Sequence, residues 1–286
     1  MSSRGLASAA IGRADDSPRG ALGLLEKRVT FATTVLLLVL AAAAWLLTIR
    51  QSGDMSGMVT GLAQVGSRMP NDMAAPLFMG MWLTMMVAMM FPTIAPMVLA
   101  HRMVVRQRGE RWSSTGVFAL GYLLVWTAIG LIPLGLFLVF RNITMPPSWL
   151  PIAAGAVLIT AGVYQFTAWK RRCLRACQSP LSFILSHDFG GGSRSAMLAG
   201  IAHGAFCLGC CWALMAVLIV VGLMNLTWMA AIALLFLAEK SLPSGLLLAR
   251  IAGTAVICIG VAVIVHPEWL TIISGGTPPP GMGGHM

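Results

Sequence analysis

Residues 196–222 read AMLAGIAHGAFCLGCCWALMAVLIVVG, a stretch without a single Asp, Glu, Lys or Arg. A helix needs roughly 20 predominantly apolar residues to cross the hydrocarbon core of a bilayer, and this stretch is long enough. It also holds one histidine and three cysteines within nine residues, from His203 to Cys211. The stretch therefore predicts a membrane-spanning helix that carries an unusual set of side chains.

Further apolar stretches predict an all-α fold, a polytopic transmembrane helical bundle of about seven spans. The chain has 286 residues, of which 58% are hydrophobic and 10% are charged. The predicted spans cover residues 29–49, 75–100, 115–140, 149–169, 196–222, 225–242 and 246–266. The span over 225–242 is short for a bilayer, and a re-entrant segment there would reduce the count to six.

Basic residues gather in alternate loops, over residues 4–28, 102–111 and 170–194, whereas the intervening loops hold few. Because cytoplasmic loops are enriched in Lys and Arg, this pattern predicts a cytoplasmic N-terminus. The formal net charge of +10 then reflects orientation in the lipid bilayer. No basic strip with stacking aromatic residues lies on a soluble domain, so we expect no nucleic-acid partner.

The chain divides into three predicted segments. Residues 1–28 form a cytoplasmic N-terminal segment, residues 29–266 the transmembrane helical domain, and residues 267–286 a disordered tail. The tail ends in SGGTPPPGMGGHM, a Gly- and Pro-rich sequence that cannot bury enough apolar surface to fold. The first span continues past its small residues as WLLTIR, which favours a retained helix over a cleaved signal peptide.

Four side chains of the span over 196–222 fall within an arc of about 100° on a helical wheel and can face one side of the helix. They are His203, Cys207, Cys210 and Cys211. Thiolate and imidazole ligands select copper(I) or zinc, and polar groups inside a membrane commonly mark a functional site. A closely packed helix face is the alternative, because cysteine behaves as a small hydrophobic residue and Gly200 and Gly204 form a GxxxG spacing.

The span over 75–100 is rich in methionine, and its methionines form two stripes. One consists of Met79, Met86, Met90 and Met97, and the opposite one of Met81, Met85 and Met89. Thioether sulfur is a soft, uncharged ligand for copper(I), but methionine is equally an adaptable packing residue. Pro92 and Pro96 should kink this helix and free the carbonyls of Ala88 and Pro92, which then need other partners.

Cys173 and Cys177 follow the fourth span and can share one helical face. They are interpreted either as a cytoplasmic two-thiolate clamp, which needs further ligands from elsewhere, or as incidental thiols in a basic surface turn. Glu239 is the only acidic residue in any predicted span, so it is a candidate proton acceptor, metal ligand or ion-pair partner. Lys240 beside it could extend to the membrane interface.

Several of these motifs resemble a family of bacterial polytopic membrane proteins of unknown function that is described as metal-binding. The resemblance rests on YQFTAWKRRCLRACQSP (164–180), HGAFCLGCCWALM (203–215) and FLAEK (236–240), with MWLTMMVAMMFPTIAPM (81–97) similar to the same family. Usual members have Pro where Ala168 stands, a departure that concerns how the fourth span ends. The resemblance implies metal binding in the bacterial inner membrane without an established reaction.

The leading hypothesis is the handling of a soft transition metal, above all copper(I) with zinc as an alternative. The ion would cross the membrane or be delivered to a metal chaperone or partner membrane subunit. The Met79 stripe would collect it together with the outer methionines Met55, Met58, Met69 and Met73. Cys207, Cys210 and His203 would hold it, and Cys173 with Cys177 would receive it. A membrane redox or metalloenzyme with Glu239 as proton acceptor, and a structural subunit without metal, are the alternatives. Metal handling is favoured over catalysis. The sequence contains no ATP-binding P-loop, which an ATP-driven pump would need.

Overall fold

The computed structural model describes residues 18–55, 75–140, 149–186, 191–222 and 225–274, and these are helical with short connections. The all-α prediction is confirmed for this part of the chain. The helices are α1 (Pro18–Met55), α2 (Ala75–Gln107), α3 (Ser113–Phe140), α4 (Leu150–Tyr164), α5 (Ala168–Gln178), α6 (Pro180–Ser186), α7 (Gly192–Val221), α8 (Leu226–Ser241), α9 (Gly245–Val265) and α10 (Glu268–Ile273).

Five of the described helices, α1, α2, α3, α7 and α9, are long and apolar enough to cross a membrane. The count becomes six if α4 and α5, which are bent by 62° relative to one another, form a single span. Helix α8 has 16 residues and so rises about 24 Å, less than the roughly 30 Å of a hydrocarbon core. The seventh span and the orientation of the chain therefore stay predictions.

The predicted span over 149–169 is broken in the structure, because α4 ends at Tyr164 and α5 begins at Ala168. Thr167 caps the new helix, and its Oγ1 accepts a hydrogen bond from the backbone N–H of Lys170 at 3.2 Å. Such a cap satisfies one of the free N–H groups at a helix start. The bend carries the exposed Arg172 and Arg175 away from the axis of α4.

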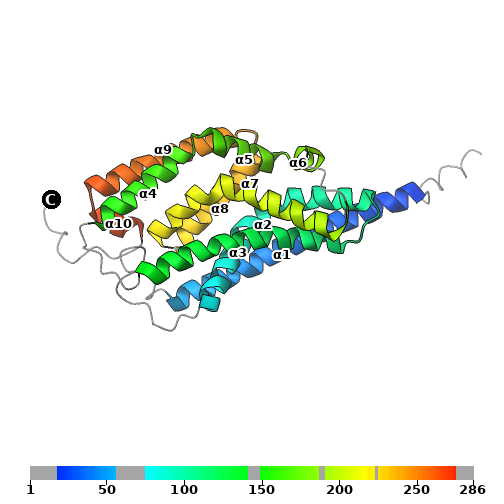
Figure 1. Cartoon of the computed structure of the whole chain (residues 1–286), viewed down its shortest axis with the longest axis horizontal. Helices are drawn as coiled ribbons and strands as arrows, with labels where there is room; N and C mark the ends of the chain where they lie inside the picture. Colours follow the sequence, from blue (N-terminus) through cyan, green and yellow to red (C-terminus); the bar gives the residue numbers. More distant parts are fainter. Residues whose placement is uncertain (1–17, 56–74, 141–148, 187–190, 223–224, 275–286) are drawn as a thin grey trace, which may run out of the picture.

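Helix α7 lies in the middle of the bundle, between the α4–α9 pair on one side and α1, α2 and α3 on the other (Figure 1). It packs against α3 most extensively, and glycine permits the close approach. A Cβ on Gly200 would collide with the carbonyl oxygen of Phe118, and one on Gly204 would lie 3.0 Å from Val125. The close-packing role of the GxxxG spacing is confirmed.

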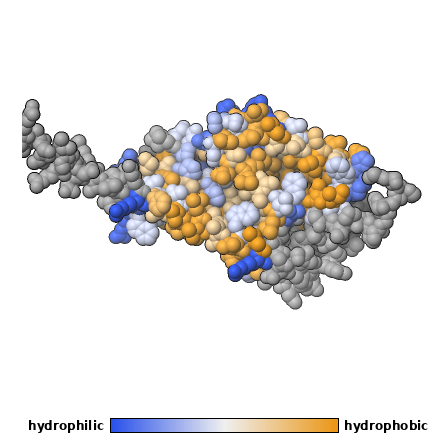
Figure 2. Space-filling view, turned by 180° about the vertical axis from the view of Figure 1, so that it is seen from behind, coloured by the Kyte–Doolittle hydropathy of each residue, from blue (hydrophilic) through white to orange (hydrophobic). Residues whose placement is uncertain are grey.

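Large apolar side chains cover much of the outer surface. Leu36, Leu131, Ile132, Leu234 and Leu247 are each more than half exposed. Figure 2 shows apolar residues spread over the body of the molecule, with hydrophilic residues in smaller patches. Soluble monomeric proteins rarely expose apolar patches of this extent, whereas a lipid-facing surface requires them.

Helix α2 continues through both of its prolines and is buried on several sides, by α1, α3, α6 and α8. As expected, the carbonyl of Ala88 finds an alternative partner, because the Trp45 indole N–H donates to it at 3.0 Å. The methionines of both stripes are buried except for Met79, which is half-buried. The side chains of Met55, Met58, Met69 and Met73 lie outside the described residues.

The predicted disordered tail over residues 267–286 is wrong for its first part, which is helical. Residues Glu268–Ile273 form α10, with Leu270 buried and the Ile273 carbonyl accepting a hydrogen bond from Trp228 Nε1 at 2.9 Å. These apolar side chains give residues 268–273 a surface to pack with. Residues 275–286 lie outside the described part of the chain.

Candidate metal centre

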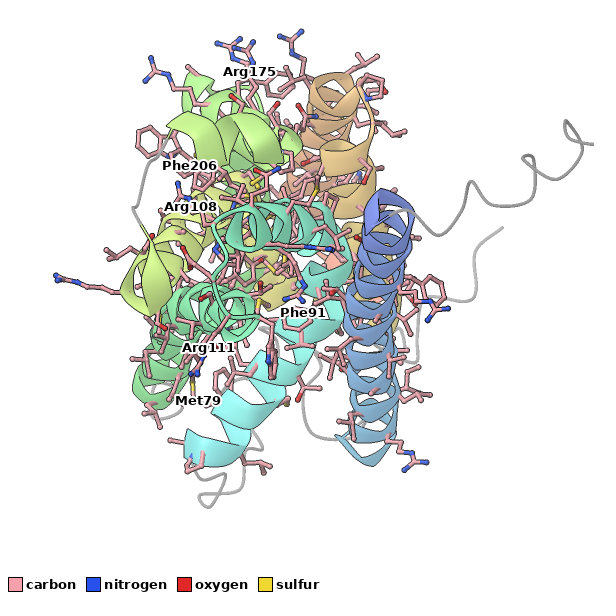
Figure 3. The ribbon with its side chains drawn as sticks, turned by 90° about the vertical axis from the view of Figure 1, so that its right-hand side faces the viewer. Met79, Phe91, Arg108, Arg111, Arg175 and Phe206 are labelled. Carbon is pink, nitrogen blue, oxygen red and sulfur yellow. The ribbon has the colours of Figure 1, made fainter. Side chains whose placement is uncertain are left out.

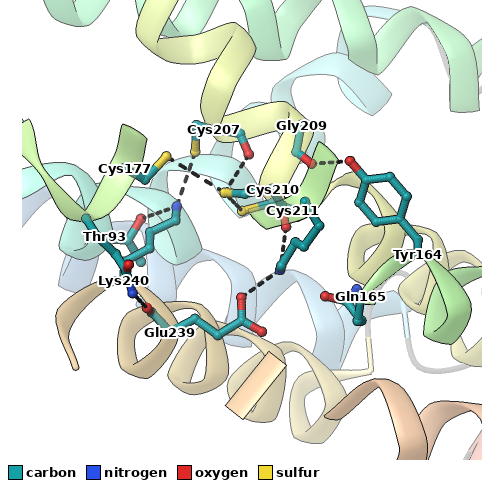
Figure 4. Close-up of polar contacts among 12 residues, drawn as sticks. Thr93, Tyr164, Gln165, Cys177, Cys207, Gly209, Cys210, Cys211, Glu239 and Lys240 are labelled. Atoms are coloured by element: carbon teal, nitrogen blue, oxygen red, sulfur yellow. Dashed lines mark hydrogen bonds and ion pairs between the residues drawn. The ribbon is translucent and has the colours of Figure 1, made fainter. Parts of the chain in front are cut away.

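Three buried thiols form a group near the middle of α7. Cys207 and Cys210 come from α7 and Cys177 from α5, and their Sγ atoms all lie within 4.8 Å of one another. The Cys177 and Cys210 sulfurs are 3.8 Å apart (Figure 4). Three sulfurs that bind one central ion at about 2.3 Å each would be roughly 4 Å apart. The observed spacing thus fits a single soft metal ion.

Glycine and helix geometry bring these thiols together. Cys207 and Cys210 are three residues apart and therefore face the same side of α7. Helix α5 can cross α7 closely because residue 209 is glycine, and a Cβ there would lie 2.6 Å from the Cys173 sulfur. The Tyr164 hydroxyl at the end of α4 donates to the Gly209 carbonyl, which fixes the bend beside the site.

The other sequence-predicted ligands lie beside the three-thiol group, and the sulfur of Cys211 is in direct contact with it. Cys211 is buried, with its sulfur 3.3 Å from that of Cys210. Cys173 is buried against Gly209. His203 is buried among aromatic rings, with its centroid 5.4 Å from that of Phe183.

The two sets of cysteines that the sequence assigns to the membrane span and to the cytoplasmic clamp therefore do not form separate sites. One of the two sequence interpretations places Cys177 in a cytoplasmic clamp with Cys173, but Cys177 lies beside Cys210 in the three-thiol group. The bend between α4 and α5 causes this difference, because it directs the Cys177 face of α5 against α7. Cys173 and Cys177 share that face, as expected, and only Cys177 reaches the group.

Lys240 points into this site rather than toward the membrane interface, so that prediction is wrong. Its Nζ donates to Cys207 Sγ at 3.2 Å and to Thr93 Oγ1 at 3.1 Å, and it lies 4.0 Å from Met90 Sδ. The Tyr122 hydroxyl is 3.1 Å from the Cys207 sulfur. These polar partners explain why the ammonium stays inside, where it can compensate the negative charge of a thiolate.

A second buried lysine forms an ion pair that the sequence did not reveal. Lys170 Nζ lies 2.7 Å from Glu239 Oε2, and the two side chains are 0% and 1% exposed. The same ammonium donates to the carbonyl of Cys210 at 2.7 Å. Gln178 Nε2 donates to the backbone carbonyl of Glu239 at 2.7 Å. The ion-pair interpretation of Glu239 is confirmed, and the pair joins α5 and α8 directly beside the thiols.

The charges around the thiols favour an anionic group. Two lysine ammoniums and one glutamate carboxylate leave one uncompensated positive charge among these three described side chains. Copper(I) held by two thiolates and one neutral thiol, or zinc held by three thiolates, has a net charge of −1 and would balance it. Because an unpaired charge in a protein interior is costly, the arrangement is suited to a metal-thiolate complex.

The α2 methionines lead toward this site. Met86 and Met90 are fully buried, and Met90 is the one that approaches Lys240. Met79 is half-buried near the start of α2, and in Figure 3 it lies at the opposite edge of the view from Arg175 on α5. These positions suit both interpretations of the stripe, a packing face and a series of thioether ligands.

Comparison with known proteins shows which family the chain belongs to. A family model described as a copper chaperone, PpoB2, matches residues 79–263, well over half of the chain. The chain belongs to this family of copper chaperones. Neither a curated protein nor a solved structure gives a match. The range that matches the copper chaperone model contains all three grouped thiols and both buried lysines, and the metal-binding character expected from the resemblance is supported.

Proposed function

We propose that the protein binds one copper(I) ion through Cys177, Cys207 and Cys210 and delivers it to a partner protein at the bacterial inner membrane. The observation that carries the proposal is the group of three buried thiols within 4.8 Å of one another. The copper chaperone family supports the same cargo. Copper is here the substrate that the protein hands over.

The number and kind of ligands favour copper(I) over zinc. A structural zinc site is closed by four tetrahedral ligands, whereas copper(I) is held well by two or three soft sulfurs. The group offers three thiols, and the thioether sulfur of Met90 lies 4.0 Å from Lys240 Nζ. Zinc would have to recruit Cys211 as its fourth ligand, and this requirement distinguishes the two metals.

The surrounding residues would hold the site ready for the ion. Lys240 compensates a thiolate at Cys207 before the ion arrives, and its bond to Thr93 keeps the ammonium in place afterwards. Lys170 fixes the backbone of Cys210, and its pairing with Glu239 fixes the position of α5 and hence of Cys177. Burial of the group keeps water and competing oxygen ligands away.

Competition with a coloured copper(I) chelator tests the proposal on the reduced protein in mild detergent. We expect one copper(I) per chain, and a loss of affinity of more than about 100-fold in Cys177→Ser, because even residues that only orient a ligand are worth about 10–100-fold. Cys173→Ser is the matched control, since Cys173 is buried on the same helix but outside the group. Undiminished binding by Cys177→Ser would refute the assignment.

Zinc competition and a Cys211→Ser variant then separate the metals. The proposal predicts that copper(I) displaces zinc and that Cys211→Ser weakens zinc more than copper. An equal loss of copper in Cys211→Ser and Cys177→Ser would indicate a four-sulfur site of the zinc type. Circular dichroism and size-exclusion chromatography of each variant show that it is folded.

Transport across the membrane is a second candidate, favoured by the α2 methionines that extend from the half-buried Met79 to the buried Met86 and Met90. In proteoliposomes with an internal copper(I) indicator, a transporter would fill the vesicles, and Met86→Leu would slow the filling. A chaperone would bind copper without filling them. The same vesicles, with a reporter on the N-terminus, test the cytoplasmic orientation.

A further inference from the structure

A small cavity lies where the C-terminal end of α2 meets the N-terminal end of α7, away from the three thiols. Its volume is about 40 Å³, and polar residues that line it include His101, Arg108, Glu110 and Ser195. This space suits a water molecule or a bare ion rather than an organic ligand. An imidazole and a carboxylate are therefore available to a small cation at this end of the bundle.

His101 in this cavity is buried, and its Nδ1 has no hydrogen-bond partner among the described residues. Its ring stacks on Phe118 with 4.6 Å between the centroids. Buried polar atoms are almost always hydrogen-bonded, so an imidazole nitrogen without a partner requires an explanation. A metal ion that visits the site would supply one.

His203 has the same property and lies closer to the thiols. It is 2% exposed, and its Nδ1 is likewise without a partner in the described part of the chain. Its ring centroid lies 6.2 Å from that of Phe118 and 6.0 Å from that of Tyr122. Because Tyr122 Oη is 3.1 Å from the Cys207 sulfur, the rings form a continuous series from the cavity to the thiols.

We propose that His203 and His101 are successive ligands on a route by which copper(I) passes between the three-thiol group and the cavity at the α2–α7 end. The inference rests on the proposed function and adds the route by which the ion leaves. Copper remains copper(I) throughout, so no electron moves, and at each step one ligand replaces another. One thiolate stays behind with Lys240 as its counter-charge, and the other takes up a proton from the solvent as copper(I) leaves.

The chemistry of the intervening residues suits this passage. Neutral imidazole nitrogen binds copper and adds no charge, so an ion can rest on it without being trapped as firmly as by thiolates. Between the two histidines lies Phe118, and the face of an aromatic ring attracts cations. At the cavity, the carboxylate of Glu110 is within reach of the arriving ion.

Release kinetics test the route. Protein loaded with one copper(I) per chain is mixed with excess water-soluble chelator, which is too bulky to enter the core, and the coloured complex is followed by stopped flow. We expect His101→Leu and His203→Leu each to slow release by about tenfold or more, equivalent to 1.4 kcal/mol of barrier. His101→Met, which restores a soft ligand, should recover most of the rate. His266→Ala, at an exposed position beyond α9, is the control and should match the wild type.

Each outcome decides a different point. Unchanged release in both leucine variants overturns the route, and so does equal slowing in His101→Leu and His101→Met, which would indicate a packing effect. If copper binding itself is lost in His203→Leu, His203 belongs to the primary site and the relay is refuted. Absence of copper binding by the wild type is seen before release is measured, and it refutes the proposed function together with this inference.

Discussion

The buried ion pair between Lys170 and Glu239 allows a quantitative test of what holds the bundle together around the thiols. Its charged atoms are 2.7 Å apart, and both side chains are almost completely buried. At an effective dielectric constant of about 20, two unit charges at this separation attract one another by about 6 kcal/mol. Removal of both charges from water offsets most of this attraction, but loss of one partner leaves the other charged and alone.

Replacement of Lys170 by methionine should therefore lower the free energy of unfolding by about 3–5 kcal/mol, the usual cost of an unpaired buried charge. The variant also loses the hydrogen bond to the Cys210 carbonyl, so we expect weaker copper(I) binding in the same protein. The double variant Lys170→Met/Glu239→Met removes both charges and should be more stable than Lys170→Met alone.

Unfolding in mixed detergent micelles, followed by circular dichroism as the SDS fraction rises, measures each free energy. A double variant as unstable as the sum of the two single losses would refute the reasoning, because the two charges would then act independently. A free energy of unfolding of Lys170→Met within about 0.5 kcal/mol of the wild-type value would also contradict the predicted cost of an unpaired buried charge, because ordinary surface substitutions have effects of this size.

Two further predictions concern packing. Gly200→Ala should destabilise the protein by about 1–3 kcal/mol in the same assay, because the added Cβ meets the backbone of α3. Gly116 has open space around it, so a Cβ in Gly116→Ala meets no neighbouring backbone and should not cause this loss. Trp45→Phe should lower the free energy of unfolding by about 1–3 kcal/mol, because it leaves the Ala88 carbonyl without a side-chain partner. Trp112 is exposed, so Trp112→Phe should lower it by less than about 0.5 kcal/mol. Equal losses in a variant and its control would contradict either prediction.

The sequence predicts the helices and part of the site because both depend on local periodicity. Cys207 and Cys210 face one side of a helix by their spacing alone, and the prolines of α2 predict the free carbonyl that Trp45 satisfies. Cys177 could not be added to the same group, because its position depends on the 62° bend after Tyr164. A bend of this kind arises from capping and tertiary contacts rather than from hydrophobic periodicity.

Lys170 was missed, although the sequence contains a signal for it. The buried residues of α5 are Lys170, Cys173, Leu174 and Cys177, which follow the i, i+3, i+4, i+7 pattern of one helix face. The lysine stands first in that pattern but also begins a run of three basic residues, which indicates a membrane-surface turn. Only its pairing with Glu239, 69 residues away in the chain, reveals that it is buried.

Sulfur atoms from α5 and α7 are proposed to hold copper(I) inside the bundle. X-ray absorption at the copper K edge, on reduced protein loaded with one copper per chain, identifies the atoms that bind the ion. Binding by the three-thiol group should give the edge of copper(I) and a first shell that contains sulfur only. A first shell of nitrogen or oxygen would refute this site, because it would place the ion outside the three-thiol group.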